Sequence, residues 1–96
     1  MMVTQRIILE RQVEFSAKVT DIREASRENG QSVWQIALDR TAFASGDTGF
    51  LRATARSGAS IEIPVVQVEE DGSCEIWHVT AKPLLADTWV TGVVTG

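Results

Sequence analysis

Cysteine and histidine are nearly absent from this 96-residue chain, which holds one of each, Cys74 and His78. A single cysteine cannot form an intrachain disulfide, so the fold has to be held together by its core. The amino-terminal apolar run Ile7–Leu9 is far shorter than the roughly 7–15 residues of a signal peptide or the roughly 20 of a membrane span. If Met1 is the natural start, we expect a chain that stays in the cytoplasm or leaves it by a route other than secretion, with no membrane partner.

An excess of basic residues is also missing. The chain has 9 Lys and Arg against 13 Asp and Glu, a net charge of −4. Nucleic-acid-binding domains present a basic surface, so this charge argues against a nucleic-acid partner. The hydrophobic content of 44% and the charged content of 23% are ordinary for a globular protein. We therefore expect a single domain over residues 1–96.

What the chain does have is an alternation of apolar and polar residues. Over residues 6–20 the odd positions are mostly apolar and the even ones mostly polar, which predicts a long strand with a bend near Arg11. Further strands are predicted over 33–39, 50–55 and 88–95, with two more inside Ile61–Val79. Turns every roughly 8–14 residues are typical of a β-sandwich or a small barrel. We predict an all-β, immunoglobulin-like β-sandwich of six or seven mainly antiparallel strands.

Glycine-containing turns indicate which strands pair. The loop Arg56-Ser57-Gly58 fits a three-residue hairpin with a left-handed glycine. The pairs that it predicts are Ala53–Ile61 and Leu51–Ile63. The Asp71-Gly72 turn leaves two registers, Val66 opposite Trp77 or Val68 opposite Cys74. We favour the second, because it places apolar residues opposite one another.

A second hairpin sequence, Asn29-Gly30, is harder to place. A two-residue turn there would set the charged Arg23 opposite Ile36. Pairing Val19 with Ile36 instead buries like with like. We therefore predict a long loop or strand extension over Asp21–Ser32, with Asn29-Gly30 as a turn inside it.

No catalytic motif is found. Cys74 and His78 fall on one predicted strand about 13 Å apart, too far for a dyad or a shared metal, so we expect a buried thiol and a partly buried histidine. The loop Ala44–Gly49 lacks the lysine and the following helix of a phosphate loop, and its Asp-Thr-Gly triplet is interpreted as a turn. The carboxylates of Glu69–Asp71 lack calcium-loop spacing. We predict a protein that is not an enzyme and has no metal, no cofactor and no small-molecule substrate.

Candidate interaction residues are two tryptophans and the acidic turn. Trp77 and Trp89 are preferred because their strand neighbours could supply the core in their place, and tryptophan is enriched in interface hot spots. Glu69, Glu70 and Asp71 form a solvated tip that could meet a protein partner. The outer strands of an open sandwich would be a further place for pairing with another chain.

The order of these elements resembles a known family. The segments that carry the resemblance are Val13–Val19, Val33–Leu38, Phe50–Gly58, Val66–Val68 and Asp71–Thr80. Together they resemble the N-terminal β-sandwich of phage baseplate upper proteins. A second likeness covers only the last third of the chain, through Asp71–Ser73, Pro83–Asp87 and Trp89–Val93. That part is similar to the end of bacterial immunoglobulin-like surface repeats.

The resemblance and the missing chemistry lead to one function hypothesis and its alternatives. The first resemblance implies a structural or assembly module of a phage or prophage particle. It would act by protein–protein docking, with self-association into a symmetric oligomer. The alternatives are a small soluble binder or inhibitor of a host protein and a bacterial immunoglobulin-like surface module. Fold alone does not decide among them.

Overall fold

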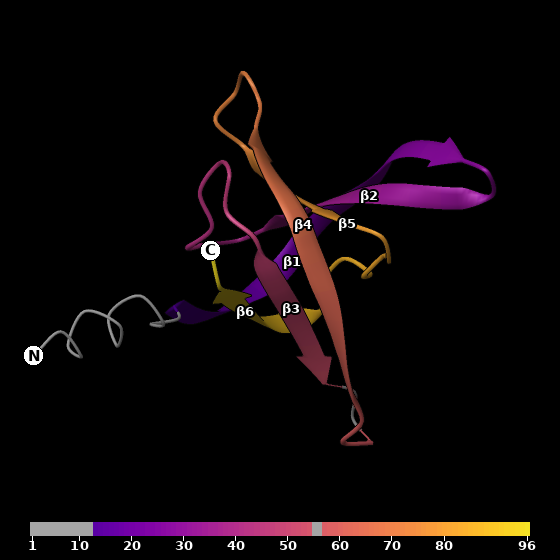
Figure 1. Ribbon diagram of the computed structural model, residues 1–96. Helices are drawn as coiled ribbons and strands as arrows, with labels where there is room; N and C mark the ends of the chain where they lie inside the picture. The colour runs from indigo at the N-terminus through magenta and orange to yellow at the C-terminus, as the bar shows by residue number, and fades with distance from the viewer. Residues whose placement is uncertain (1–12, 55–56) are drawn as a thin grey trace, which may run out of the picture.

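The computed structural model describes residues 13–54 and 57–96, which form six β-strands and no helix (Figure 1). In chain order the strands are β1 (Val13–Glu28), β2 (Gln31–Leu38), β3 (Gly49–Thr54), β4 (Ser60–Glu70), β5 (Ile76–Thr80) and β6 (Trp89–Val94). The all-β class predicted from the alternation is confirmed. The part of the predicted first strand over residues 6–12, with its bend near Arg11, lies outside the described residues.

The strands close into one barrel in the order β1-β2-β5-β4-β3-β6, with every neighbouring pair antiparallel. The predicted immunoglobulin-like sandwich is therefore wrong, because a sandwich consists of two separate sheets with open edges. Closure depends on β1, which pairs with β6 over its first part and with β2 from Val19 onwards. A register shift between Val19 and Asp21 marks a bulge, and a bulge bends its strand. The bent strand can therefore serve both neighbours.

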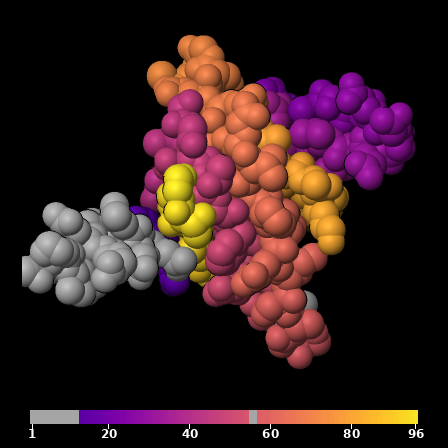
Figure 2. Space-filling model, viewed as in Figure 1, coloured from indigo at the N-terminus to yellow at the C-terminus, as the bar shows by residue number. Residues whose placement is uncertain are grey.

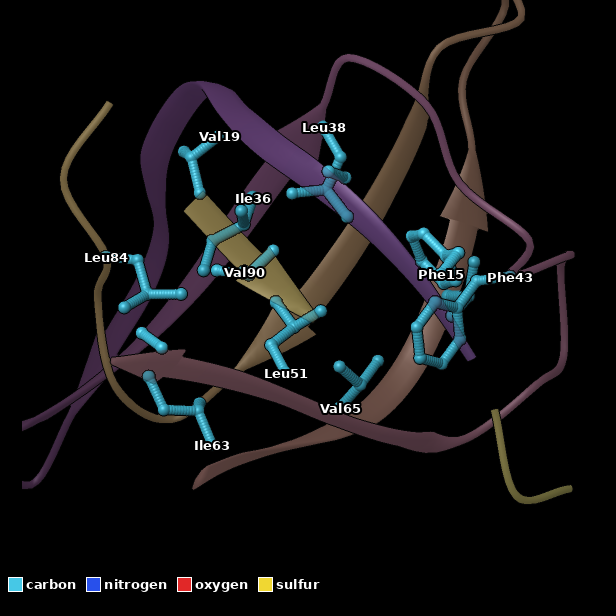
Figure 3. Packing of buried hydrophobic residues seen from close by; sticks show 13 residues of the cluster. Phe15, Val19, Ile36, Leu38, Phe43, Leu51, Ile63, Val65, Leu84 and Val90 are labelled. Atoms are coloured by element: carbon cyan, nitrogen blue, oxygen red, sulfur yellow. The ribbon is translucent and has the colours of Figure 1, made fainter. Parts of the chain in front are cut away.

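Side chains from two loops fill the ends of the barrel. Phe43, between β2 and β3, is buried and makes edge-to-face contacts with Phe15, at a centroid distance of 5.8 Å, and with His78, at 5.1 Å. Leu84, between β5 and β6, joins the same cluster, and Figure 3 shows it on the side opposite Phe43. The interior is thus a packed core rather than a channel, and Phe43 plugs one end of it.

The β1–β2 hairpin projects from the barrel as a two-stranded ribbon (Figure 1). Asn29 and Gly30 have φ values of 55° and 77° and close a two-residue turn between Glu28 and Gln31. This is the turn that primed hairpins require. Of the two alternatives predicted for Asp21–Ser32, the structure shows the strand extension with Asn29-Gly30 as its turn and not the long loop, but the predicted pair Val19–Ile36 is wrong because Val19 pairs with Leu38. We call residues 25–33 the ribbon; its base is the pair Glu24–Trp34.

The two remaining hairpins differ in how well their registers were predicted. Between β3 and β4 the pairs Ala53–Ile61 and Leu51–Ile63 are confirmed, and Gly58 has a positive φ of 93°. Between β4 and β5 both predicted registers are wrong, because Glu70 pairs with Ile76 across a five-residue turn.

Candidate functional site

One carboxylate organises the β4–β5 turn. Oδ1 of Asp71 accepts hydrogen bonds from Ser73 N–H at 2.9 Å, Ser73 Oγ at 2.7 Å and Glu75 N–H at 3.0 Å. Oδ2 accepts a fourth from the indole Nε1 of Trp77 at 3.0 Å. The indole bond, followed by those from Ser73 and Glu75, holds the pKa of Asp71 well below its usual value of 3.8, since all of them favour the charged form. Both oxygens of Asp71 are thus used within the fold.

Trp77 is buried on the outer face of the barrel. Its neighbour His78 pairs with the buried Ile36 and faces the interior, so the alternation along β5 turns Trp77 outward. The residue is nevertheless only 5% exposed, and it is not part of the hydrophobic core cluster. The guanidinium of Arg23 lies 4.0 Å from its ring centroid, a cation–π contact. Trp77 therefore connects β1 to the turn that Asp71 organises.

The two glutamates of the acidic turn have different surroundings. Glu69 accepts a hydrogen bond from Gln35 Nε2 at 2.8 Å and another from Gln67 Nε2 at 3.0 Å. Gln35 in turn accepts one from Arg23 Nε at 2.7 Å, which extends the outer network around Trp77. Glu70 is exposed, and within the described part of the chain its side chain makes no hydrogen bond. Of the three predicted acidic residues, Glu70 is the one that the fold does not use.

Trp89 lies on a different surface. It is the first residue of β6 and is 63% exposed, and Lys18 Nζ lies 5.7 Å from its ring centroid. The neighbouring pair Ala53–Val90 places it beside the β3–β4 hairpin. Trp77 sits beside the turn at the other end of β4. The five predicted interaction residues therefore form no single site: Trp77 and Glu69–Asp71 share one end of the barrel, and Trp89 is at the other.

His78 is buried and fully hydrogen-bonded. The carbonyl oxygen of Ile36 can only accept, so the Nδ1–H of His78 donates to it at 2.7 Å. Nε2 is then the acceptor, and it receives the hydroxyl of Thr41 at 2.8 Å. The Thr41 oxygen also accepts from Phe43 N–H at 3.0 Å, which fixes the loop that carries the plug. Burial lowers the pKa of His78 below its ordinary 6.5 despite the bond to Ile36.

The stability of the protein should depend on pH in two windows. Because the folded-state pKa of His78 lies below 6.5, the unfolded chain binds the proton more readily, and stability should fall as the pH drops below 6.5. Asp71 has a lowered pKa, so its contribution is present above 3.8 and should be lost as the pH falls further. Urea denaturation across a pH series measures both losses. His78→Gln, which cannot titrate, should remove the first window and keep the second; equal wild-type stability at pH 7 and pH 5 would contradict the account.

Cys74 is not the buried thiol that the sequence predicted. It is exposed in the five-residue turn with a positive φ of 68°, because that turn is longer than either predicted register allowed. It therefore does not share a strand with His78. Within residues 13–54 and 57–96, no three His, Cys, Asp or Glu side chains gather into a group that could hold a metal ion.

The ribbon is the functional candidate that sequence reasoning missed. Its signal was present, since Asn29-Gly30 is a strong turn sequence. A single register from that turn would put Arg23 opposite Ile36, however, so the sequence alone does not predict a continuous hairpin. The register shift between Glu24 and Ser26, which lies between the turn and Arg23, removes this conflict. Arg23 consequently pairs with Gln35, and Ile22 with Ile36.

Comparison of the chain with protein-family models, with curated proteins and with solved structures finds no match. The described residues also contain no helix that is long and apolar enough to cross a membrane. What the structure defines is a small, closed, six-stranded antiparallel barrel with a projecting ribbon and an exposed tryptophan on a separate surface.

Proposed function

We propose that this chain is a non-catalytic assembly module that docks onto neighbouring protein subunits, and that the ribbon is its docking arm. The structural observation behind the proposal is that the ribbon contributes nothing to the barrel. Beyond the pair Glu24–Trp34, β1 pairs only with β2, and β2 reaches β5 only from Trp34 onwards. Figure 2 shows the ribbon standing clear of the rest of the molecule.

Ordering such an arm costs free energy in an isolated chain. Ordering each residue costs about 1–2 kcal/mol of conformational entropy, and a two-stranded hairpin alone is marginally stable in water. Every residue of the ribbon except the half-buried Ser32 is exposed. In the free protein, therefore, little apolar burial offsets this entropy cost. A partner that covers the ribbon would supply the missing burial.

Side-chain hydrogen bonds nevertheless support the ribbon. On one face Glu24 accepts hydrogen bonds from Ser32 Oγ and from Arg27 Nε, the latter at 3.2 Å. On the other face Val33 is 37% exposed opposite Ser26. Beyond the pair Glu24–Trp34 both outer strand edges of this arm are open, because β1 and β2 pair there only with each other. These features support protein–protein docking, and the resemblance to phage baseplate proteins makes a phage or prophage particle the assembly that we propose.

Shortening the ribbon tests this proposal. Deleting residues 25–28 and 31–33 joins Glu24 to Trp34 through Asn29-Gly30, which keeps the turn and every barrel strand pair. Light scattering over a concentration series should show an oligomer for the wild type and a smaller mass for the shortened chain, with little change in melting temperature. An unchanged mass would contradict the role of the ribbon. A wild-type monomer throughout would contradict self-association and point to the alternative of a soluble binder of another protein.

A further inference from the structure

Three of the exposed large apolar side chains gather at the end of the barrel that carries Trp89. Trp89 is 63%, Leu85 78% and Ile61 44% exposed. Thr88 connects them, because it precedes Trp89, donates its N–H to the carbonyl of Leu85 at 3.2 Å and lines a hollow together with Ile61. Scattered apolar residues on a surface are normal, but a contiguous group of them marks an interaction site.

The hollow beside Trp89 has the size and the lining of an apolar socket. It has a volume of about 340 Å³ and opens between the β3–β4 hairpin and the loop before β6. The residues that line it are Ala53, Thr54, Ala59, Ser60, Ile61 and Thr88. All except Ile61 are small, so their side chains leave the space open. The same end of the molecule thus carries an exposed indole ring and an apolar cavity, and Thr88, which lines the cavity, directly precedes Trp89 in the chain.

Charges of both signs flank this pair of features. Lys18 Nζ lies 5.7 Å from the Trp89 ring centroid, and within the described residues it makes no ion pair. Asp87 is exposed two residues before Trp89, held there by the hydrogen bond from its N–H to the carbonyl of Val19 at 2.7 Å. An isologous interface requires a surface that complements itself, and an exposed indole, a hollow, a cation and an anion on one end of the barrel are features that can pair in this way. In a two-fold dimer each feature of one copy meets its counterpart on the other.

We propose that two copies of this chain pair through this end of the barrel. The indole of Trp89 of each copy enters the hollow of the other, and Lys18 of each copy faces Asp87 of its partner. The inference rests on the proposed assembly function but uses a surface separate from the ribbon. It assigns Trp89 the role of a hot-spot residue, a large aromatic anchor in a desolvated pocket.

Two substitutions remove the knob and the socket separately. Trp89→Ala removes the indole, and Ala59→Phe fills the hollow from an exposed position. Each should raise the dimer dissociation constant by about 30-fold or more, as expected for loss of a hot spot, in sedimentation equilibrium of the full chain. Val66→Ala, which truncates an exposed side chain outside the hollow, should leave the constant unchanged. Circular dichroism melts show whether each variant is folded.

A mixture of the two variants tests directly whether the indole of one copy enters the hollow of the other. The Ala59→Phe copy keeps its indole and the Trp89→Ala copy keeps its hollow, so an equimolar mixture should form a heterodimer tighter than either homodimer.

Charge exchange gives an independent test, since Lys18→Glu should weaken the dimer and Lys18→Glu with Asp87→Lys should restore it. The ribbon-shortened chain should still dimerise. Variants Trp89→Ala and Ala59→Phe that both oligomerise as the wild type does would overturn this inference and leave the ribbon proposal standing, whereas a monomeric wild type would overturn both.

Discussion

Replacing Gly49 by alanine should destabilise the barrel by more than about 3 kcal/mol, the upper end of the usual cost of overpacking a core. Gly49 begins β3 and pairs with Val94 on one side and Val65 on the other. A Cβ at Gly49 would overlap the carbonyl oxygen of Val93 and lie 3.1 Å from Cε1 of Phe43. Because the first of these neighbours is backbone of β6, it can retreat only if strand pairing that closes the barrel is broken.

The measurement is the free energy of unfolding from urea denaturation, with Gly72→Ala as the matched control. A Cβ at Gly72 would meet nothing within 4 Å, and the residue does not have a positive φ. Gly72→Ala should therefore be neutral or stabilise by up to about 1 kcal/mol, through the reduced entropy of the unfolded chain. A Gly49→Ala protein that unfolds at the wild-type urea concentration would show that β3 and β6 approach less closely than described here.

Gly49 also shows where sequence patterns reach their limit. The small-residue loop around Asp47 predicts turns at both Gly46 and Gly49. Gly46 has a positive φ of 92°, as a turn residue can, but Gly49 is a strand residue whose missing side chain admits a neighbouring strand. A glycine in a strand often marks such a close approach. The strand that approaches Gly49 is determined by how the sheet closes. The residues near Gly49 in the sequence do not indicate which strand that is.

The strands themselves were predictable because their residues alternate, and the β3–β4 register was predictable because its loop is short. Choosing between a sandwich and a barrel required knowledge of which distant strands pair. β6 lies between β1 and β3, two strands that are distant from it in the sequence. The bulges that bend β1 and β4 leave a weak trace in the sequence. In β4 the shift between Val65 and Gln67 explains why apolar residues change parity between Ile63 and Val68.

The candidate interaction residues divide for a similar reason. Trp77 and Trp89 look alike in the sequence, since each lies in a strand among apolar neighbours. Arg23 lies over the ring of Trp77 and Asp71 accepts its indole N–H, and Trp77 is 5% exposed, whereas Trp89 remains 63% exposed with Lys18 Nζ 5.7 Å from its ring centroid. Composition identifies residues that could anchor an interface, and tertiary structure decides which of them stay exposed.

The contact between Phe15 and Gly92 provides the second large effect. Phe15 on β1 pairs with Gly92 on β6, and a Cβ at Gly92 would overlap the ring of Phe15. The ring also packs edge-to-face on Phe43. Phe15→Ala should cost about 3–5 kcal/mol, as expected for removal of a buried phenylalanine. That is a large fraction of the roughly 5–15 kcal/mol that stabilises a domain of this size.

A double-mutant cycle isolates the contact. Gly92→Ala alone should destabilise by about 1–3 kcal/mol, because the ring of Phe15 must move out of a packed core. In the Phe15→Ala background the obstacle is gone, so the same change should cost little or even stabilise, since alanine fits a strand better than glycine. The two substitutions should therefore be strongly non-additive, with a coupling energy of about 1 kcal/mol or more in urea denaturation. Additive losses would mean that Gly92 is required by the backbone rather than by Phe15. Gly49, whose obstacle is a carbonyl group, should show no such rescue when Phe43 is truncated to alanine.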